Sequence, residues 1–205
     1  FESPDDVVML DRQFRKLFKK FGIECETIKR PIKGPDGRSI GPNLEIKEAL
    51  RLLERTEDRS LELEKVVLEM AGKIFENTKK ARIGEGKQMA EEILDSGRAL
   101  EKFWEIAFAQ GATKRVNSTD IHGGKLRYSL LSDRDGVVKR IDNITLVTIT
   151  RALGSPAIKE AGIRIEKMPG ETVKKGEPLL TMYATTENRL LAGKGFLDID
   201  KLFTF

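Results

Sequence analysis

The chain has 205 residues, of which 39% are hydrophobic and 34% are charged, a composition typical of a globular protein with a heavily charged surface. Its 37 basic and 33 acidic residues leave a net charge of +4, but the two signs are interleaved, unlike the one-sided basic surface of a nucleic-acid-binding protein. No stretch approaches the roughly 18 consecutive apolar residues of a membrane span. We therefore expect neither nucleic acid nor a membrane as a partner.

The start of the chain and its single cysteine bear on where the protein is located. The chain begins at Phe1 without an initiator methionine or a signal-peptide pattern, so we interpret it as a piece of a longer or processed polypeptide. Its only cysteine, Cys25, excludes an intramolecular disulfide and argues against a four-ligand zinc site. Cys25 is expected to be a buried residue of a strand. A cytoplasmic, reducing location is the expectation that follows.

The first elements of the chain are predicted to be a helix and a short strand. Apolar residues recur at three- and four-residue steps between residues 4 and 21, which is typical of an amphipathic helix capped by Ser3 and ended by Gly22. Residues 23–28 are predicted to form a strand. A loop rich in proline and glycine follows at residues 31–42.

The middle of the chain is predicted to be helical. Four segments with helical spacing start at Asn43 as a cap, after a charged break at residues 54–60, after Gly86 and after Gly97, and the last one ends at Gly111. In the second segment, one face of the predicted helix carries the apolar residues Leu63, Val66, Val67, Met70 and Ile74.

The last part of the chain is predicted to be rich in strands. Short β-type runs occupy residues 126–131, 136–141, 162–166 and 178–183, and one helix is expected at residues 144–153. The predicted fold class is α+β, with a subdomain boundary near residue 115. The helical part is expected to pack against the β-rich part through Phe103, Trp104 and Ala107.

Few residues indicate chemistry by themselves. His122 has no companion at metal-ligand spacing and is interpreted as a surface histidine. Residues 84–87 read Gly-Glu-Gly-Lys, but Ala81 and Gln88 stand where a phosphate loop needs Gly and Ser or Thr. Glu45 and Glu48 lie three residues apart on one helix face, behind the glycine loop. They indicate either a cation or acid–base site, or a solvated helix start.

Several segments between residues 39 and 184 resemble, in order and spacing, the thymidine/AMP phosphorylase family of nucleoside-type phosphorylases. Residues 39–50 resemble a glycine turn leading into a helix with the pattern G-[NP]-x-L-E-x-[RK]-E-A, and residues 70–76 its next helix. Residues 84–97 and 102–111 resemble the two helices after that. Residues 151–184, which begin Arg-Ala-Leu-Gly-Ser-Pro, are the most specific match. Pro42, where bacterial members more often have Asn, favours the archaeal AMP phosphorylase branch.

The resemblance implies a protein with a helical lobe, an α/β lobe and a C-terminal α+β region. Residues 1–42 would then supply an edge strand, a helix and the glycine turn of the α/β lobe. Residues 43–114 would form a helical segment, and residues 115–205 a β-rich C-terminal α+β domain.

The resemblance also implies reversible phosphorolysis of a nucleoside or nucleoside monophosphate, of AMP or thymidine type, to free base and a sugar 1-phosphate. Inorganic phosphate is the co-substrate, and a homo-oligomer is expected. The family's phosphate loop and its sugar- and base-binding residues lie upstream of the matched region. No catalytic or substrate-binding residue is therefore expected in this chain, which should be inactive by itself.

The resemblance implies one site within the chain. In cation-binding members, two backbone carbonyls of the glycine turn and the second glutamate of the following helix hold a monovalent cation. Transferred to this sequence, these positions are Asp36, Ser39 and Glu48, and the cation would be potassium.

A second resemblance suggests a function of another class. Residues 166–179 are similar to the G-x-x-V-x-x-G-x-x-L turn of biotinyl and lipoyl domains, which implies a hammerhead-like C-terminal domain. The alternative function is a carrier-like or protein-interaction module without catalysis. A carrier lysine, however, is flanked as Met-Lys-Met or Asp-Lys-Ala, and neither triplet occurs in the sequence.

Overall fold

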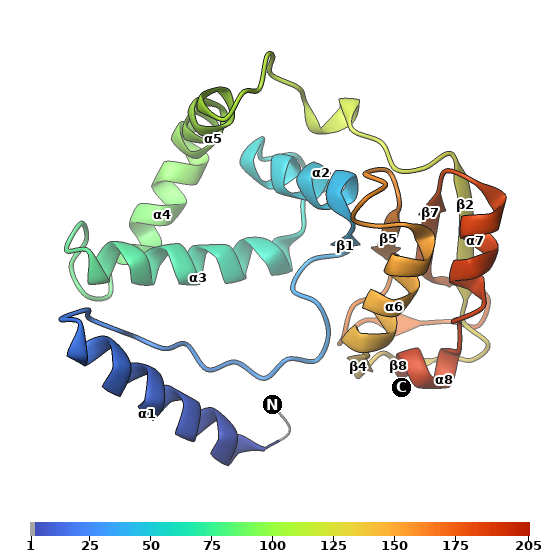
Figure 1. The fold of residues 1–205 in the computed structure, drawn as a ribbon, viewed down its shortest axis with the longest axis horizontal. Helices are drawn as coiled ribbons and strands as arrows, with labels where there is room; N and C mark the ends of the chain where they lie inside the picture. The colour runs from blue at the N-terminus through green and yellow to red at the C-terminus, as the bar shows by residue number, and fades with distance from the viewer. Residues whose placement is uncertain (1–2) are drawn as a thin grey trace.

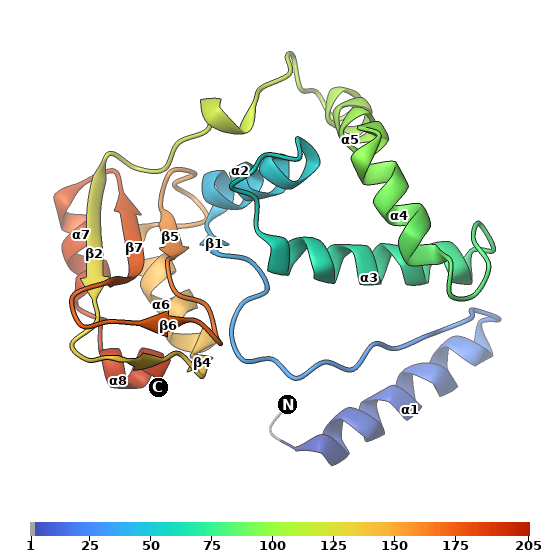
Figure 2. The same cartoon turned by 180° about the vertical axis from the view of Figure 1, so that it is seen from behind.

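The computed structural model describes residues 3–205 (Figure 1). Its first element is α1 (Pro4–Lys20), and the predicted cap is confirmed because the Ser3 hydroxyl accepts hydrogen bonds from the N–H groups of Asp5 and Asp6. Gly22, with a φ of 67°, lies just after the helix end. In both views α1 lies apart from the sheet, at the end of a long extended connection (Figures 1 and 2).

The predicted strand at residues 23–28 is wrong. The segment pairs with no strand in the part of the chain that the structure describes. It runs back along α1, where the guanidinium of Arg15 donates to the carbonyl of Cys25 and to the hydroxyl of Thr27. Extended backbone becomes a strand only where a second strand satisfies its peptide groups. Here no second strand pairs with the segment among residues 3–205, one carbonyl of the segment is bound by the side chain of Arg15, and Cys25 is partly exposed instead of buried.

Four helices follow: α2 (Pro42–Leu53), α3 (Leu61–Asn77), α4 (Gly86–Asp95) and α5 (Arg98–Ala109). All four predicted helical segments are confirmed, but the start of α2 differs. Its cap is Gly41, and the side-chain amide of Asn43 donates to the carbonyl of His122 instead of capping the helix. The α3 helix begins after Ser60, whose hydroxyl accepts the N–H of Leu63.

The helical part has a small core. Its buried residues are Leu52, Leu68, Ala90 and Leu94. The α4 helix contacts α3 at Gly72, where a Cβ on Gly86 would lie 2.1 Å from the Gly72 carbonyl oxygen, so the two backbones touch.

The apolar face predicted for α3 is only partly covered by other residues. Val67, Met70 and Ile74 are 41%, 52% and 60% exposed. The α4 helix packs on the side of α3 that carries Gly72, because only there can the backbones approach closely. The α3 helix keeps an apolar stripe on its surface.

The position of α5 corrects a packing prediction. Trp104 is 6% exposed and makes an edge contact with the ring of Phe103, so it is buried as expected. However, α5 packs mainly on α4 and α2, and it lies away from the sheet in both views (Figures 1 and 2). The helical part reaches the β-rich part through α2, which contacts β1 (Ser39–Ile40) and β5 (Gly162–Ile165).

A four-stranded antiparallel sheet organises the C-terminal part, in the order β1-β5-β7-β2. The β2 (Leu126–Leu131) and β7 (Pro178–Ala184) strands confirm two predicted strands, and β5 a third. The α6 helix (Asn143–Leu153), also predicted, and α7 (Glu187–Lys194) cover one face of the sheet (Figure 1). The edge strand β1 comes from the glycine loop, so the N-terminal segment is part of this sheet.

The remaining elements are short. They are η1 (Ser118–Asp120), β3 (Gly136–Val137), β4 (Arg140–Ile141), β6 (Thr172–Val173), α8 (Ile199–Leu202) and β8 (Phe203–Thr204). The single strand predicted at residues 136–141 is two strands, because β3 pairs with β6 while β4 pairs with β8. The mixed helices and strands agree with the α+β class. Across residues 3–205 no helix has the length and apolar character to cross a membrane.

The two faces of the sheet differ in chemistry. Ile163 of β5 pairs with Met182 of β7, and both are fully buried under the helices, as are Ile165 and Leu180. Arg164 lies between these two isoleucines on β5, pairs with Thr181 of β7 and points to the other face. The core therefore lies on the helix side, and a polar face is left open.

Candidate functional site

The glycine turn at residues 34–41 lies against Glu48 of α2. Glu48 is 8% exposed, and its carboxylate accepts the N–H groups of Arg38 at 2.8 Å and of Ser39 at 2.9 Å. Gly37 leaves room for this contact, since a Cβ at that position would lie 2.8 Å from the Glu48 carboxylate. Charge-assisted hydrogen bonds of this kind are stronger than neutral ones. Glu48 therefore fixes the conformation of the turn.

The end of the turn is fixed to both α2 and β5. The N–H of Gly41 donates to Glu45 at 2.9 Å, so both glutamates indicated by the sequence bind the same loop. Gly41 has a φ of 118°, and a Cβ there would lie 2.4 Å from the carbonyl oxygen of Ala161. On the facing strand, a Cβ on Gly162 would lie 2.3 Å from the carbonyl oxygen of Ile40. Only glycine fits at both positions.

The three residues expected at a cation site make different contacts. Ser39 and Glu48 are in contact, whereas the side chain of Asp36 pairs with Arg30 at 2.5 Å. Both carboxylate oxygens of Glu48 already accept backbone N–H groups, which braces the turn without an ion. A cation would use their remaining lone pairs together with carbonyl oxygens of the turn.

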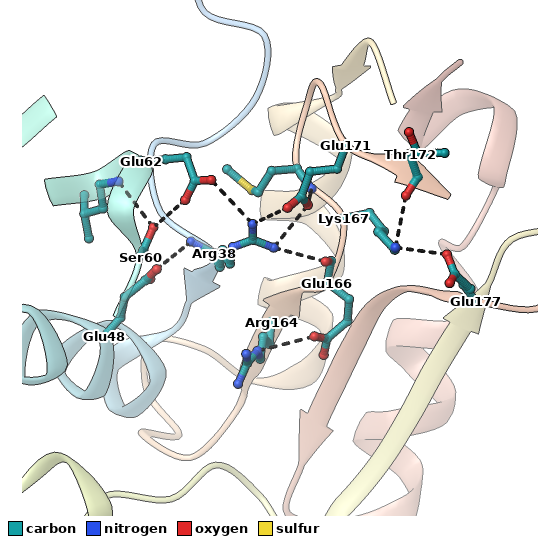
Figure 3. Close-up of polar contacts among 12 residues, drawn as sticks. Arg38, Glu48, Ser60, Glu62, Arg164, Glu166, Lys167, Glu171, Thr172 and Glu177 are labelled. Atoms are coloured by element: carbon teal, nitrogen blue, oxygen red, sulfur yellow. Dashed lines mark hydrogen bonds and ion pairs between the residues drawn. The ribbon is translucent and has the colours of Figure 1, made fainter. Parts of the chain in front are cut away.

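Arg38 joins the turn to the C-terminal part (Figure 3). Its guanidinium donates to both carboxylate oxygens of Glu171, at 2.6 and 3.2 Å, and to the carbonyl of Glu166 at 3.0 Å. Glu62, at the start of α3, lies 3.7 Å away on the other side. A bidentate arginine–carboxylate pair fixes both partners in direction as well as distance.

Burial and pairing act in opposite directions on this ion pair. Burial by itself raises the pKa of Glu171, but hydrogen bonds from Arg38 and from the N–H of Met168 outweigh it and hold the pKa below its ordinary value. Burial by itself lowers the pKa of Arg38. The hydrogen bond and the charge of Glu171 raise it, and the pKa of Arg38 lies above its ordinary value overall. Both groups are therefore charged near neutral pH.

A cleft of about 520 Å³ opens beside the turn, between α2, the open face of the sheet and the loop around His122. The basic residues that line it are Arg38, Lys47, Arg51, Arg59, Arg127 and Arg164. The acidic residues that line it are Glu48, Asp58, Glu62 and Glu166. His122 is exposed, with its ring Nδ1 3.0 Å from the carbonyl oxygen of Asp120, so the surface interpretation is confirmed. Of these residues, sequence reasoning singled out only Glu48 and His122.

The comparisons with known proteins agree on one family. The family described as the pyrimidine nucleoside phosphorylase C-terminal domain matches residues 137–192. AMP phosphorylase of Methanothrix thermoacetophila is 40% identical over 192 residues, which cover 91% of this chain and 36% of that protein. AMP phosphorylase 1 of Archaeoglobus fulgidus is 44% identical over 88% of this chain and 35% of its own length. AMP phosphorylase of Pyrococcus horikoshii is 38% identical over 92% of this chain and 37% of its own length.

This similarity extends over nearly the whole chain, whereas the chain spans only about a third of the length of these curated relatives. The resemblance found in the sequence is confirmed. The chain is therefore similar over most of its length to about a third of the length of archaeal AMP phosphorylases, and residues 137–192 match the C-terminal domain of the pyrimidine nucleoside phosphorylase family.

Proposed function

We propose that this chain is part of an enzyme that cleaves the N-glycosidic bond of AMP with inorganic phosphate. A phosphate oxygen forms a bond to the anomeric carbon while the bond from that carbon to the base breaks. The electron pair leaves with the base, which takes up a proton, and the sugar keeps its 5′-phosphate and gains a 1-phosphate. Catalysis of this kind relies on positioning and on electrostatic stabilisation of the transition state.

The observation that carries this proposal is identity of about 40% to archaeal AMP phosphorylases over nine tenths of the chain. It favours AMP over thymidine or uridine as the substrate. The chain's own contribution is structural: α2 and the sheet hold the glycine turn in one conformation, through Glu48 and Gly41. A fixed turn is the kind of support that a precisely positioned active site requires.

We propose further that this turn binds a monovalent cation, potassium, through Glu48 and the carbonyl oxygens of Asp36 and Ser39. The contact between Glu48 and Ser39 supports it. The hydrogen bonds from backbone N–H groups to Glu48 are also expected if Glu48 only braces the turn. The bracing role and the cation-binding role therefore differ in one measurable respect. Only a cation site makes the activity of the intact protein depend on potassium through Glu48.

The proposal also covers the oligomeric state of the protein, its location and the geometry of its C-terminal part. We propose a cytoplasmic homo-oligomer whose C-terminal part has the hammerhead geometry of biotinyl and lipoyl domains. Exposed apolar residues on α3, among them Met70 and Ile74, support association of this region with another surface. The turns at Gly170 and Gly176, both with positive φ, support the hammerhead-like hairpin. A carrier function is not favoured, because the related proteins are named as phosphorylases.

The experiment that tests the function measures base release. The intact polypeptide that contains this chain is incubated with AMP, adenosine, thymidine or uridine, with and without phosphate, and the products are separated by chromatography. We expect adenine from AMP, only when phosphate is present. The 205-residue chain assayed alone should release no base above the buffer control, because the resemblance places the phosphate loop outside it. If the intact protein released base from none of the four substrates, the proposal would be refuted.

A further inference from the structure

The open face of the sheet carries a row of polar side chains. Residues that pair directly in an antiparallel sheet point to the same face. Arg127 of β2 pairs with Tyr183 of β7. Two residues earlier in β7, Thr181 pairs with Arg164 of β5. The two arginines are therefore on one face, on either side of β7. Lys47 of α2 lines the same cleft.

The charges in this cleft are only partly neutralised. Arg38 pairs with Glu171, Arg51 with Asp58 at 2.8 Å, and Arg59 with Glu64 at 2.5 Å. Neither Lys47 nor Arg127 has a carboxylate within salt-bridge distance among residues 3–205. Arg164 has one at 3.4 Å, in Glu166. Two of these three positive charges, on Lys47 and Arg127, therefore have no carboxylate in direct contact within the described part of the chain, while Glu48 and Glu62 line the same cleft beyond salt-bridge distance of them.

The environment of Lys47 shows that these positive charges act on one another. Burial lowers the pKa of Lys47, and the charges of Arg51, Arg164 and Arg127 lower it further against the opposing effect of Asp58. Like charges held together in this way destabilise the unliganded cleft. An anion placed among them would remove the repulsion.

Two of the three basic side chains are also held in place by contacts other than ion pairs. The guanidinium of Arg127 lies 5.3 Å from the centre of the Tyr183 ring, a cation–π contact. The ammonium group of Lys47 donates to the carbonyl of Ile121 at 2.9 Å and keeps two further donors. Side chains that are already ordered lose little conformational entropy when a ligand binds.

We propose that Lys47, Arg127 and Arg164 bind a phosphoryl group, supplied either by inorganic phosphate or by a nucleoside monophosphate. Two guanidinium forks and one ammonium group match the several oxygens and the double charge of a phosphoryl group better than the single charge of a carboxylate. A cleft of about 520 Å³ has the size of a small-molecule site. The inference rests on the charges and geometry of this chain and does not depend on the proposed reaction.

The test is direct binding to the 205-residue chain, by calorimetry at low ionic strength, with inorganic phosphate, AMP and adenosine as separate ligands. Phosphate and AMP should bind and compete with each other, and adenosine should not bind. Loss of one charge-assisted contact, in Lys47→Gln, Arg127→Gln or Arg164→Gln, should weaken binding about 10- to 100-fold. The matched control is Arg189→Gln, which removes the same charge from an exposed position on α7 and should leave binding unchanged.

Thermal unfolding separates a binding defect from a folding defect. Without phosphate, Lys47→Gln and Arg127→Gln should unfold at the same temperature as the original chain or higher, because repulsion is removed. With phosphate, only the original chain and Arg189→Gln should be stabilised. Absence of phosphate and AMP binding, equal binding by all variants, equal binding of adenosine and AMP, or binding of an RNA oligonucleotide alone would each overturn the proposal.

Discussion

The two hydrophobic cores of this molecule differ in kind. In the β-rich part, sixteen buried residues form one cluster, and many of them are fully inaccessible. In the helical part the cluster has four buried residues, while α3 exposes Met70 and Ile74 on its surface. A sheet covered by helices buries its apolar face within one compact unit. A single layer of helices buries only the side that meets its neighbours, so the helical part gains less stability from its own contacts.

Truncation of one isoleucine in each region should show this difference most strongly. Ile149 of α6 is fully buried, and Ile149→Ala should cost about 2–5 kcal/mol of unfolding free energy. Ile74 of α3 is 60% exposed, and Ile74→Ala should cost less than about 1 kcal/mol, because little apolar contact is lost and alanine favours the helix. Urea unfolding followed by circular dichroism measures both.

The single tryptophan, Trp104, sharpens that measurement because it lies in the helical part. Its fluorescence reports the unfolding of α5, whereas circular dichroism reports the whole chain. If the two regions depend on separate cores, Ile149→Ala should shift the dichroism transition more than the fluorescence transition. Equal costs for the two alanine variants would contradict the contrast between the regions.

Replacement of Glu48 tests the contact between the regions and should have an intermediate effect. Glu48→Gln removes the charge that accepts two N–H groups and turns an amide donor toward one of them, at a cost of about 1–3 kcal/mol. Glu45→Gln is the matched control, since Glu45 is exposed and accepts one N–H group. Chemical unfolding of the chain gives both values.

The same variant tests the cation in the intact protein. If Glu48 holds potassium, Glu48→Gln should abolish any dependence of activity on potassium, and Glu45→Gln should preserve it. A potassium dependence that is unaltered by Glu48→Gln would leave turn bracing as the only role of Glu48.

The smallest effect is expected at the Arg38–Glu171 pair. Its partners are partly exposed, so Glu171→Gln should cost below about 1 kcal/mol at neutral pH. The pKa of Glu171 is lowered in the folded state, so the stability that its charge contributes is present above its unfolded pKa of about 4.3. That contribution is lost as the pH falls through the folded pKa.

The difference between the original chain and Glu171→Gln should therefore shrink when unfolding is measured at successively lower pH. Glu160→Gln, at an exposed position whose side chain has no hydrogen bond or ion pair among residues 3–205, should show no such trend. A difference that grows toward acid pH would show that the pair does not stabilise the fold through charge.

Elements with strong local signals could be predicted from the sequence. The β2 strand has its predicted bounds at residues 126–131, and α1 has its predicted cap, because strand alternation and helix capping are local properties. The α7 helix was not predicted, since Leu190, Leu191 and Ala192 stand together without helical spacing. Residues 23–28 have strand-like composition, but whether extended backbone becomes a strand depends on a partner.

The candidate site likewise has features that follow from neighbouring residues in the sequence and features that depend on the tertiary structure. The sequence by itself determined the resemblance to the family, the glycine turn and the position of Glu48 behind that turn, because all of these are patterns of neighbouring residues. Lys47, Arg127 and Arg164 look in the sequence like ordinary surface charges, since they are far apart and belong to no basic cluster. Only the tertiary structure decided that they face one cleft, because sheet register and the close contact of Gly41 with β5 set which side chains meet. Charges interact through distance in space, which separation along the chain does not specify.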